Sequence, residues 1–451
     1  MYIHLIAIGG AIMHNLAIDL QAMGHKITGS DDDIRNPSAT RLKKYKLHPE
    51  ELGWFPEKIN NQIDLIILGM HARKDNTELL KANEMGLKVM SFPEFVANKS
   101  IDKTRVVIAG SHGKTSTTAM IMHILKSAKI NFDYLVGSQV DGFEKMVRIS
   151  DASIIIIEGD EYLSSSIDLR PKFVHYKPNI SILTGIAWDH INVFPTYKSY
   201  LKAFIDYTDT FESDTKCFYY QNDEELIKIL KHSKGVWLGY EAIKYRMNGD
   251  GSYSVRDSKS KAYPIQIFGM HNLENLSAAV QVCKELGVNE KLIFSSLDSF
   301  KGAARRLEII YQASDRIAFL DFAHSPSKIK STIKACKSRF FGRKLIAIYE
   351  LHTFSSLNAD FLKEYQSAFG KAEEAIVFFD RNTLVTKRMP ILDSNAIRNG
   401  FQRQDLKVFT EKHELIDYLT TLSYENSVLL MMSSGSFGGI QINDLAQTLL
   451  K

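Results

Sequence analysis

The stretch that decides the fold reads VVIAGSHGKTSTT and runs from Val106 to Thr118. Its apolar start predicts a buried strand, its two glycines predict a turn, and the residues after Lys114 predict a helix. A strand, a glycine turn and a helix N-terminus direct backbone N–H groups and the positive end of a helix dipole at one point, which favours a phosphate. Lys114 adds a mobile positive charge, and Thr115 adds a hydroxyl that can ligate Mg²⁺.

The spacing of this loop differs from the standard phosphate-binding pattern, in which another glycine lies five residues before the second one. Ile108 occupies that place, so the loop has the shorter form Gly-x-x-Gly-Lys-Thr. The alternative is a glycine turn that only caps an ordinary helix. Packing alone does not explain a lysine and a threonine directly after the turn, so a phosphate site is favoured.

The composition is that of an ordinary globular protein. The chain has 451 residues, of which 45% are hydrophobic and 24% charged, and this length predicts two to four domains. The formal net charge is only +4, and no run of Lys and Arg is long enough to follow a phosphate backbone. Nucleic acid is therefore not an expected partner.

The cysteines and the apolar runs predict a location in the cytoplasm. Cys217, Cys283 and Cys336 show no pairing or CxxC spacing, which is typical of buried reduced thiols. The chain opens directly with a strand pattern, and no apolar run reaches membrane-spanning length. We therefore expect a cytoplasmic protein without a membrane span, and the oligomeric state stays open.

Residues 1 to about 95 alternate short apolar runs with helical patterns, which predicts a parallel sheet of the Rossmann type. The first strand ends in Gly9 and Gly10, and the second ends at Ser30 and Asp31. Ligands bind at the carboxyl ends of such strands, so these residues are candidates for contact with a diphosphate and a sugar hydroxyl. A plain tight turn explains the two glycines about as well, because they do not spell Gly-x-Gly-x-x-Gly.

Two strand ends in the middle segment carry candidate metal ligands. The apolar run 153–157 is typical of a central parallel strand and ends in Glu158-Gly159-Asp160-Glu161. Carboxylates at the tip of a buried strand need a cation or solvent, and Mg²⁺ is the plausible cation beside a phosphate loop. A further strand, 180–184, leads to Asp189 and His190. An exposed acidic turn and an ordinary core or surface histidine are the alternatives.

The rest of the middle segment predicts a turn and a long helix. The sequence from Asn248 to Ser252 is a turn signal, and we expect a small antiparallel excursion over residues 215–268. A helix from residue 269 to 286 begins with His271, Asn272 and Asn275. The two asparagines share one helix face, and the residues alone favour helix capping over contact with an adenine.

The third segment predicts a second Rossmann-like sheet. Ile317 to His324 read as a strand that ends near Asp321, whose carboxylate can accept hydrogen bonds from ribose hydroxyls. Further strands are expected at 345–349, 375–379 and 428–432, alternating with helical stretches. The predicted fold is α/β with three domains at 1–98, 99–303 and 304–451, and the polar stretch from Ala97 to Ser100 is the predicted first connector.

Taken in order, these motifs resemble the Mur ligases of peptidoglycan synthesis over essentially the whole chain. The resemblance rests on the first strand that ends in two glycines, GSHGKTS from Gly110, EGDEY from Glu158, Asp189-His190, HNLEN from His271, RRLE from Arg305 and DFAH from Asp321. It implies an N-terminal Rossmann-like domain that binds a UDP-sugar, a central P-loop ATPase-like domain and a C-terminal Rossmann-like domain that binds the amine. It also implies an ATP-dependent ligase that uses Mg²⁺ and forms C–N bonds.

The same resemblance implies a role for each candidate residue. The residues expected to bind ATP are Gly110, Ser111, His112, Gly113, Lys114, Thr115, Ser116, His271, Asn272, Asn275, Arg306 and Asp321. The expected metal ligands are Thr115, Glu158 and His190, and the expected catalytic residues are Lys114, His190 and Arg306. The UDP-sugar is expected at Gly9, Gly10, Ser30 and Asp31.

Within the family, the motifs are most similar to the branch that joins the lactyl carboxylate of UDP-N-acetylmuramate to L-alanyl-γ-D-glutamyl-meso-diaminopimelate through an acyl phosphate, in peptidoglycan recycling. The alternative branch uses L-alanine in de novo synthesis. Two departures from the family pattern, Glu350 to Ser356 and His324-Ser325, lie in the amine-binding domain and leave the amine open. A nucleotide-driven switch without ligation is the alternative from another functional class.

Overall fold

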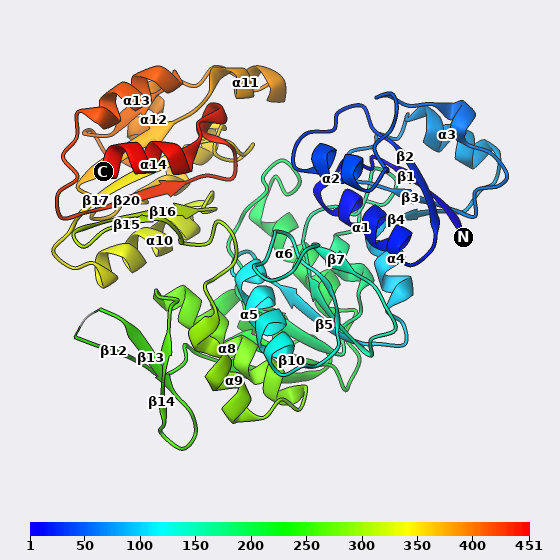
Figure 1. Ribbon diagram of the computed structural model, residues 1–451, viewed down its shortest axis with the longest axis horizontal. Helices are drawn as coiled ribbons and strands as arrows, with labels where there is room; N and C mark the ends of the chain where they lie inside the picture. Colours follow the sequence, from blue (N-terminus) through cyan, green and yellow to red (C-terminus); the bar gives the residue numbers. More distant parts are fainter. Residues whose placement is uncertain (250) are drawn as a thin grey trace. The chain divides into compact units, whose positions relative to one another are not determined.

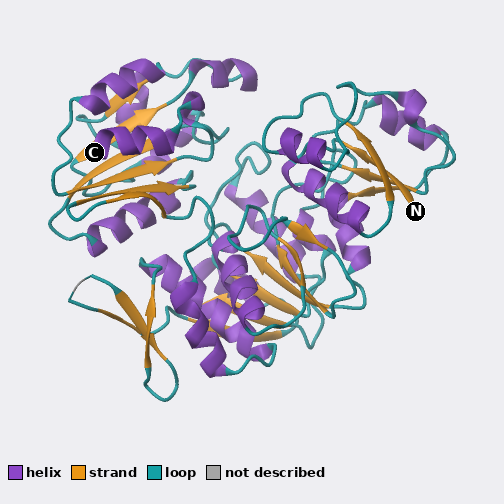
Figure 2. Cartoon of the chain, in the orientation of Figure 1, coloured by secondary structure: helices purple, strands orange, loops and turns teal. Residues whose placement is uncertain are grey.

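The computed structural model describes residues 1–249 and 251–451, and it confirms the α/β fold class. The described strands form separate sheets with helices alongside them (Figures 1 and 2). The chain divides into two compact units. The first unit comprises Met1–Ile186, Leu201–Glu241 and Ala278–Val288, and the second comprises Ala187–Tyr200, Ala242–Ser277 and Asn289–Lys451.

The first sheet has the strand order β2-β1-β3-β4, and all its neighbours are parallel, as predicted. Its elements are β1 (Tyr2–Ile6), α1 (Ala11–Ala22), β2 (Lys26–Ser30), α2 (Ser38–Lys44), β3 (Leu65–Leu68), α3 (Thr77–Glu84), β4 (Val89–Ser91) and α4 (Phe92–Lys99). The apolar runs of β1 and β3 are buried with Leu79 of α3 in one core, because a parallel strand covered on both faces is apolar throughout.

The predicted polar connector at residues 97–100 is wrong. Residues 97–99 form the last turn of α4, and Ser100 follows as its C-cap. Ser91 and Glu94 form a capping box and Pro93 lies in the first turn, and both features stabilise the start of the helix. Its polar end has the composition of a linker but continues the helical hydrogen bonds.

The main sheet has the order β11-β10-β9-β5-β8-β6-β7 and is parallel except for the edge strand β7. Its elements are β5 (Thr104–Ala109), α5 (Lys114–Ser127), β6 (Asp133–Leu135), β7 (Val147–Arg148), β8 (Ile154–Glu158), β9 (Ile180–Leu183), α6 (Tyr197–Thr208), β10 (Lys216–Tyr220), α7 (Glu224–Leu230) and β11 (Val236–Tyr240). In β5 and β8, Ile108 pairs with Glu158, so the phosphate loop and the acidic strand end leave neighbouring strands at the same edge.

The predicted antiparallel excursion is narrower than residues 215–268. An antiparallel sheet is formed by β12 (Tyr245–Met247), β13 (Tyr253–Arg256) and β14 (Ala262–Ile265). β10 and β11 instead extend the parallel main sheet. Asp250 of the predicted turn lies outside the described residues, and the predicted helix follows as α8 (Met270–Glu285), with α9 (Glu290–Ser296) after it.

The C-terminal sheet has the order β15-β16-β20-β17-β18-β19, in which β15 is antiparallel to β16 and the other neighbours are parallel. Its elements are β15 (Glu308–Gln312), β16 (Arg316–Asp321), α10 (Pro326–Arg339), β17 (Lys344–Glu350), β18 (Glu374–Phe378), α11 (Arg381–Lys387), α12 (Ser394–Phe401), β19 (Lys407–Phe409), α13 (Lys412–Thr420), β20 (Ser427–Met432) and α14 (Ile442–Leu450). The central strands are fully buried, as predicted for a second Rossmann-like sheet. Short 3₁₀ helices complete the chain: η1 (Pro56–Lys58), η2 (Lys172–His175), η3 (Leu297–Ser299), η4 (Ala359–Tyr365) and η5 (Phe437–Gly439).

Within the first unit, helix α1 is hydrogen-bonded to the residues on either side of β7. Asn15 Oδ1 accepts a hydrogen bond from the Met146 N–H at 3.0 Å, and the Asp19 carboxylate accepts one from the Ile149 N–H at 2.7 Å. The first sheet and the main sheet therefore share one compact unit. The predicted domain boundaries at 98/99 and 303/304 stay predictions.

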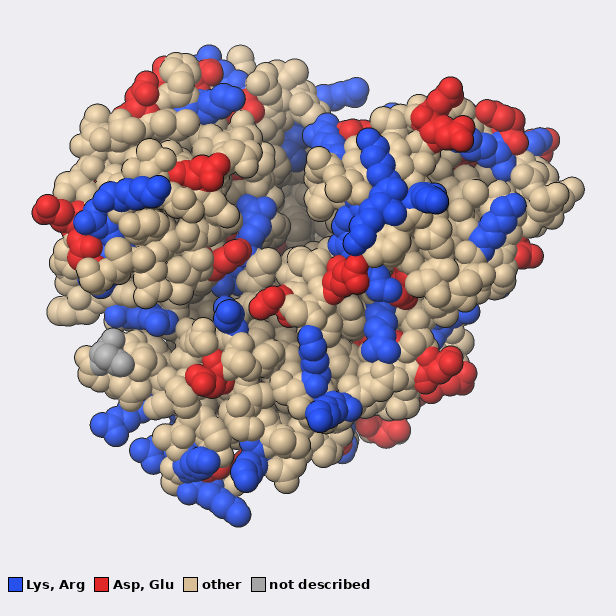
Figure 3. Space-filling view, viewed as in Figure 1, with Lys and Arg blue, Asp and Glu red and all other residues tan. Residues whose placement is uncertain are grey.

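On the face shown in Figure 3, cationic and anionic side chains are interspersed. No helix in the described part of the chain is long and apolar enough to cross a bilayer.

Candidate active site

The predicted phosphate loop joins β5 to α5 in the first unit. Gly110 has a φ of 128° and Gly113, the N-cap of α5, has a φ of 81°, and a glycine adopts these angles without strain. A Cβ atom on Gly110 would collide with Thr184 and lie 2.9 Å from its backbone nitrogen. The loop therefore requires glycine at this position, and α5 begins without a side-chain cap, which leaves its first N–H groups directed at the loop.

Lys114 is held at the mouth of this loop by buried acceptors. Its ammonium donates to the Gly110 carbonyl oxygen and to Glu161 Oε2, both at 2.6 Å. The Glu161 side chain is fully buried and that of Lys114 is 13% exposed. Burial lowers the pKa of Lys114, but the carboxylates of Glu161 and Asp160 outweigh burial and raise the pKa above its ordinary value. The raised pKa favours the charged ammonium, which is the form that attracts a phosphate.

Asp160 belongs to the same acidic strand end but has another partner. Lys172 donates to its carboxylate at 2.6 Å. Burial raises the pKa of Asp160, but Lys172 and Lys114 outweigh it, so the pKa lies below its usual value. The carboxylates that follow β8 are thus divided: Glu161 faces the loop lysine and Asp160 faces Lys172.

Thr115 and Glu158 meet at the end of β8. The Thr115 hydroxyl donates to Glu158 Oε1 at 2.8 Å, and the Gly137 N–H donates to Glu158 Oε2 at 2.7 Å. One carboxylate and one hydroxyl beside a phosphate loop fit Mg²⁺, which takes oxygen ligands and is usually held by one or two carboxylates together with substrate phosphates. Among the described residues, no group of three or more His, Cys, Asp or Glu side chains gathers as a metal cage.

Gly137, which was not among the predicted site residues, sets the position of the Glu158 carboxylate. A Cβ atom at Gly137 would lie 2.8 Å from Glu158 Oε1. The atom in the way is the end of a flexible side chain, so the carboxylate moves while the fold stays intact. A glycine after the short strand β6 is the signal in the sequence, but only the strand order β5-β8-β6 shows which carboxylate it meets.

We predict that Gly137→Ala raises the Mg²⁺ concentration needed for half-maximal turnover by roughly 10-fold, because a ligand is displaced rather than removed. The thermal midpoint stays close to that of the wild type. Ser138→Ala is the matched control, since the buried Ser138 hydroxyl has no hydrogen-bond partner. A Gly137→Ala variant with an unchanged Mg²⁺ requirement would contradict this role.

The predicted UDP-sugar residues lie together at the carboxyl ends of β1 and β2. The Gly9 N–H donates to Asp31 Oδ2 at 2.7 Å, and the Ser30 carbonyl accepts from the N–H of Ala7 at 2.9 Å. Burial raises the pKa of Asp31, an effect that the Gly9 N–H partly offsets. The buried Ser30 hydroxyl has no hydrogen-bond partner. Asp31 therefore stabilises the glycine turn and is also a candidate to bind a sugar hydroxyl.

In the second unit, Asp321 braces the chain between the middle and C-terminal segments. Its carboxylate accepts from the N–H groups of Leu307 at 2.7 Å and Ala323 at 2.8 Å. Arg305 and Leu307 both have positive φ, 55° and 49°, which costs free energy for residues with a side chain. The predicted contact of Asp321 with ribose stays a prediction, and in this structure the carboxylate holds the strained turn.

Phe322, another residue that the sequence did not single out, orients the two arginines of this turn. The guanidinium of Arg306 lies 4.6 Å from the centre of the Phe322 ring and that of Arg305 lies 5.2 Å from it, within the range of cation–π attraction. Arg305 also donates to the carbonyl oxygens of Ser433 and Gly435, each at 2.8 Å. The turn therefore presents Arg306 on an aromatic support.

The other predicted residues of the second unit lie at the start of α8 and after β9. Asn272 donates to the Phe268 carbonyl oxygen at 2.9 Å, so its amide stabilises the entry to α8. Burial lowers the pKa of His271, and the negative charge of Asp321 partly offsets this effect. His190 has a φ of 56°, and its N–H donates to Asp189 at 2.8 Å. The structure thus divides the predicted residues: those of the phosphate loop and Glu158 lie in the first unit, and His190, Arg306 and the α8 residues lie in the second.

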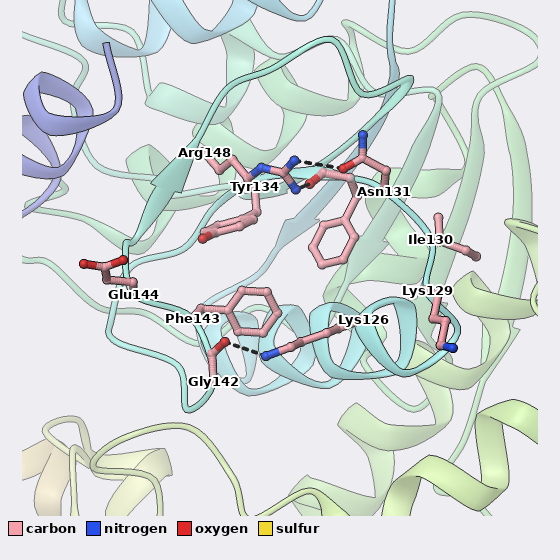
Figure 4. Close-up of a pocket in the computed structure, with 10 residues that line it drawn as sticks. Lys126, Lys129, Ile130, Asn131, Tyr134, Gly142, Phe143, Glu144 and Arg148 are labelled. Atoms are coloured by element: carbon pink, nitrogen blue, oxygen red, sulfur yellow. Dashed lines mark hydrogen bonds between the residues drawn. The ribbon is translucent and has the colours of Figure 1, made fainter. Parts of the chain in front are cut away.

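A hollow of about 420 Å³ lies between the end of α5 and the strands β6 and β7, away from the predicted residues (Figure 4). Two of the cations that line it are hydrogen-bonded to the protein backbone. Lys126 donates to the Gly142 carbonyl oxygen at 2.6 Å, and Arg148 donates to the Phe132 carbonyl oxygen at 2.9 Å. These contacts hold the wall of the hollow.

Three family models match this chain in sequence. They are described as "Mur ligase family, catalytic domain" over residues 2–103, "Mur ligase middle domain" over residues 108–283 and "Mur ligase, glutamate ligase domain" over residues 305–435. Together they leave only short stretches of the chain unmatched.

Two kinds of ligase are among the proteins with full-length sequence similarity. The chain is 29% identical to UDP-N-acetylmuramate–L-alanine ligase of Clostridium kluyveri, over 96% of this chain and 95% of that protein. It is 26% identical to UDP-N-acetylmuramate–L-alanyl-γ-D-glutamyl-meso-2,6-diaminoheptandioate ligase of Escherichia coli, over 98% of this chain and 96% of that protein.

Solved structures show the same fold. The murein peptide ligase of Psychrobacter arcticus has a TM-score of 0.70 at 24% identity, and UDP-N-acetylmuramate-alanine ligase of Thermotoga maritima has a TM-score of 0.71 at 20% identity. Each comparison covers 100% of this chain and 98% of the other.

Proposed function

The chain belongs to the Mur ligase family, and from this premise we propose that it joins the lactyl carboxylate of UDP-N-acetylmuramate to the amine of L-alanyl-γ-D-glutamyl-meso-diaminopimelate. Members of the family are ATP-dependent ligases that form amide bonds, and this chain is such a ligase. The observation that carries the proposal is the loop from Gly110 to Ser116, with Lys114 at its mouth and the Thr115–Glu158 pair beside it.

The reaction must bring two negatively charged groups together. The lactyl carboxylate attacks the γ-phosphate of ATP and becomes an acyl phosphate, and ADP leaves. The amine then attacks the carbonyl carbon, and phosphate leaves. Positive charge that is already in place lowers the cost of this approach. Lys114 supplies it at the terminal phosphate, and Arg306 is the second candidate cation.

Thr115 and Glu158 are the proposed ligands of Mg²⁺, with His190 as a further candidate. The ion, when bound, offsets negative charge on the phosphate oxygens. The contribution of this chain is to direct the two oxygen ligands: the Gly137 N–H holds one oxygen of Glu158, and the Thr115 hydroxyl lies against the other. The N–H groups at the start of α5 orient the phosphates.

The first sheet is proposed to bind the UDP-sugar at Gly9, Gly10, Ser30 and Asp31. Support comes from the close approach at Gly9, where a Cβ atom would lie 2.8 Å from Ile34 and 2.9 Å from Asp31. Glycines at the carboxyl end of a parallel strand let the backbone come close to a diphosphate. The place of the enzyme in recycling and its location in the cytoplasm stay predictions.

The relatives differ in the amine substrate that their names give. The tripeptide is favoured by the motifs around Glu158 and Arg305, whereas the similarity to the L-alanine ligase of Clostridium kluyveri favours L-alanine as the second candidate. The carboxyl edge of the C-terminal sheet differs from the family pattern at Glu350 and His352. Gly435 lies close to His352 there: a Cβ atom on Gly435 would lie 2.5 Å from the histidine ring.

We predict that, with UDP-N-acetylmuramate and ATP present, the rate of phosphate release is about 10-fold or more higher with the tripeptide than with L-alanine. A site built for the longer acceptor gains contacts that L-alanine lacks. The assay compares L-alanine, the tripeptide and the corresponding tetrapeptide at equal concentration. Turnover with L-alanine alone would assign the chain to the other branch. Phosphate release that needs no amine would instead favour the nucleotide-driven switch.

A further inference from the structure

We propose that Lys328 is a positioning residue that fastens the segment carrying His190 to the carboxyl edge of the C-terminal sheet. The inference rests on the proposed function for its kinetic consequences. The contact itself lies within the second unit, which contains residues 187–200 and 289–451.

The centre of this contact is the buried carboxylate of Asp189. Its side chain is 6% exposed, and its Oδ2 lies 3.5 Å from Lys328 Nζ and 3.5 Å from His324 Nε2. Lys328 Nζ also lies 3.3 Å from His324 Nε2. A buried carboxylate needs such partners, because an unpaired charge in the interior is costly.

The geometry of His324 makes Lys328 the group that joins Asp189 to His324. Burial and the neighbouring ammonium of Lys328 lower the pKa of His324, which favours the neutral ring. His324 Nδ1 lies 2.8 Å from the Phe322 carbonyl oxygen, so in the neutral ring Nδ1 carries the hydrogen and Nε2 is an acceptor. A neutral Nε2 has no hydrogen to donate to Asp189. The ammonium of Lys328 can donate to both groups and therefore joins them.

The support for Lys328 is rigid. Tyr349 and Tyr365 both donate their hydroxyls to the His324 carbonyl oxygen, at 2.8 and 3.1 Å. Both tyrosines are fully buried. His324 and its ring nitrogen are thus fixed to the C-terminal sheet, and Lys328 follows on α10.

The contact reaches His190 through the backbone. The Asp189 carboxylate accepts from the His190 N–H at 2.8 Å, and His190 has the left-handed φ of 56°, which a residue with a side chain adopts only when its surroundings hold it there. The next N–H, that of Ile191, donates to the Ser355 hydroxyl at 3.3 Å. The segment is therefore held at successive residues, and Lys328 neutralises the charge at its centre.

The test replaces Lys328 with methionine and uses Lys330→Met as the matched control, because Lys330 lies exposed on the same helix. We expect Lys328→Met to lower kcat by roughly 10-fold, as expected for a displaced positioning contact, with KM values for ATP and UDP-N-acetylmuramate within about 2-fold of wild type. Lys328→Arg recovers most of the lost kcat. Hydrogen exchange of the backbone amides in residues 187–196 becomes faster in Lys328→Met and stays unchanged in Lys330→Met.

A second variant tests whether the loss of kcat comes from the lost positioning contact or from an unpaired buried charge. Asp189→Asn combined with Lys328→Met removes the pair without leaving a buried charge, so the thermal midpoint returns towards wild type while kcat stays low. Wild-type kcat in this double variant, or unchanged exchange of residues 187–196 in Lys328→Met, would overturn the proposal. If the wild-type enzyme ligates no amine, the proposed function fails, and the exchange experiment still decides the contact.

Discussion

Replacing Lys114 with methionine is expected to reduce amide ligation by roughly 10³-fold or more, because the residue supplies the fixed positive charge that meets the terminal phosphate. The structure adds a complication. Lys114 is also the partner of the fully buried Glu161 carboxylate, and removal of one member of a buried pair costs about 3–5 kcal/mol. Loss of activity in the single variant therefore needs a control for folding.

The control is Lys114→Met combined with Glu161→Gln, which removes both charges and leaves a neutral side chain of nearly the same size. We expect the double variant to regain the wild-type thermal midpoint but not its turnover. Lys172→Met is the matched comparison, because it breaks the neighbouring pair with Asp160 and leaves the loop lysine in place. Turnover near the wild-type rate in the double variant would show that Lys114 does not serve the reaction.

Glu158→Gln is expected to lower ligation by about 10²- to 10³-fold, the range found when one charge-stabilising group is lost. The amide keeps the size of the side chain, but one of its ends is a donor. In wild type, the Thr115 hydroxyl and the Gly137 N–H both donate to the carboxylate. In the variant, the amide oxygen can keep the Gly137 N–H and the NH₂ group can donate to the Thr115 hydroxyl, which also accepts hydrogen bonds. The variant therefore loses the negative charge that attracts Mg²⁺ but keeps a hydrogen-bonding side chain of the same size.

The measurement is the binding of Mn²⁺, as a probe for Mg²⁺, in the presence of a non-hydrolysable ATP analogue, together with turnover across Mg²⁺ concentrations. Asp160→Asn is the control, because this carboxylate follows the same strand but is paired with Lys172. We expect weaker Mn²⁺ binding in Glu158→Gln and little change in Asp160→Asn. Equal Mn²⁺ affinity in Glu158→Gln and wild type would remove Glu158 from the metal site.

The parallel sheets and the phosphate loop were predictable because their signals are contiguous in the sequence. An apolar run followed by glycines and a helix start predicts β5, the loop and α5 from residues 106–118 alone, and the same argument holds for β1 and Gly9. The polar end of α4 misled the prediction at residues 97–100, because a helix terminus and a linker have similar composition. The ligand contacts assigned to these residues by resemblance stay predictions.

Other parts of the site were beyond a reading of the sequence. Gly137 follows a three-residue strand without any motif, and Phe322 and Lys328 lie within a stretch that was interpreted through Asp321 and His324. The roles of these residues depend on neighbours that are far away in sequence: Gly137 meets Glu158 across 21 residues, and Lys328 meets Asp189 across 139 residues.

The sequence by itself determined the alternation of strands and helices, the glycine turns at their ends and the membership in the Mur ligase family. These features depend on side-chain periodicity and on backbone angles that neighbouring residues decide. Only the tertiary structure decided that Gly137 holds Glu158, that Phe322 supports Arg306 and that Lys328 joins Asp189 to His324. Those pairs depend on strand order and on the packing of loops at sheet edges, which arise from long-range burial of apolar surface and leave no local pattern in the chain.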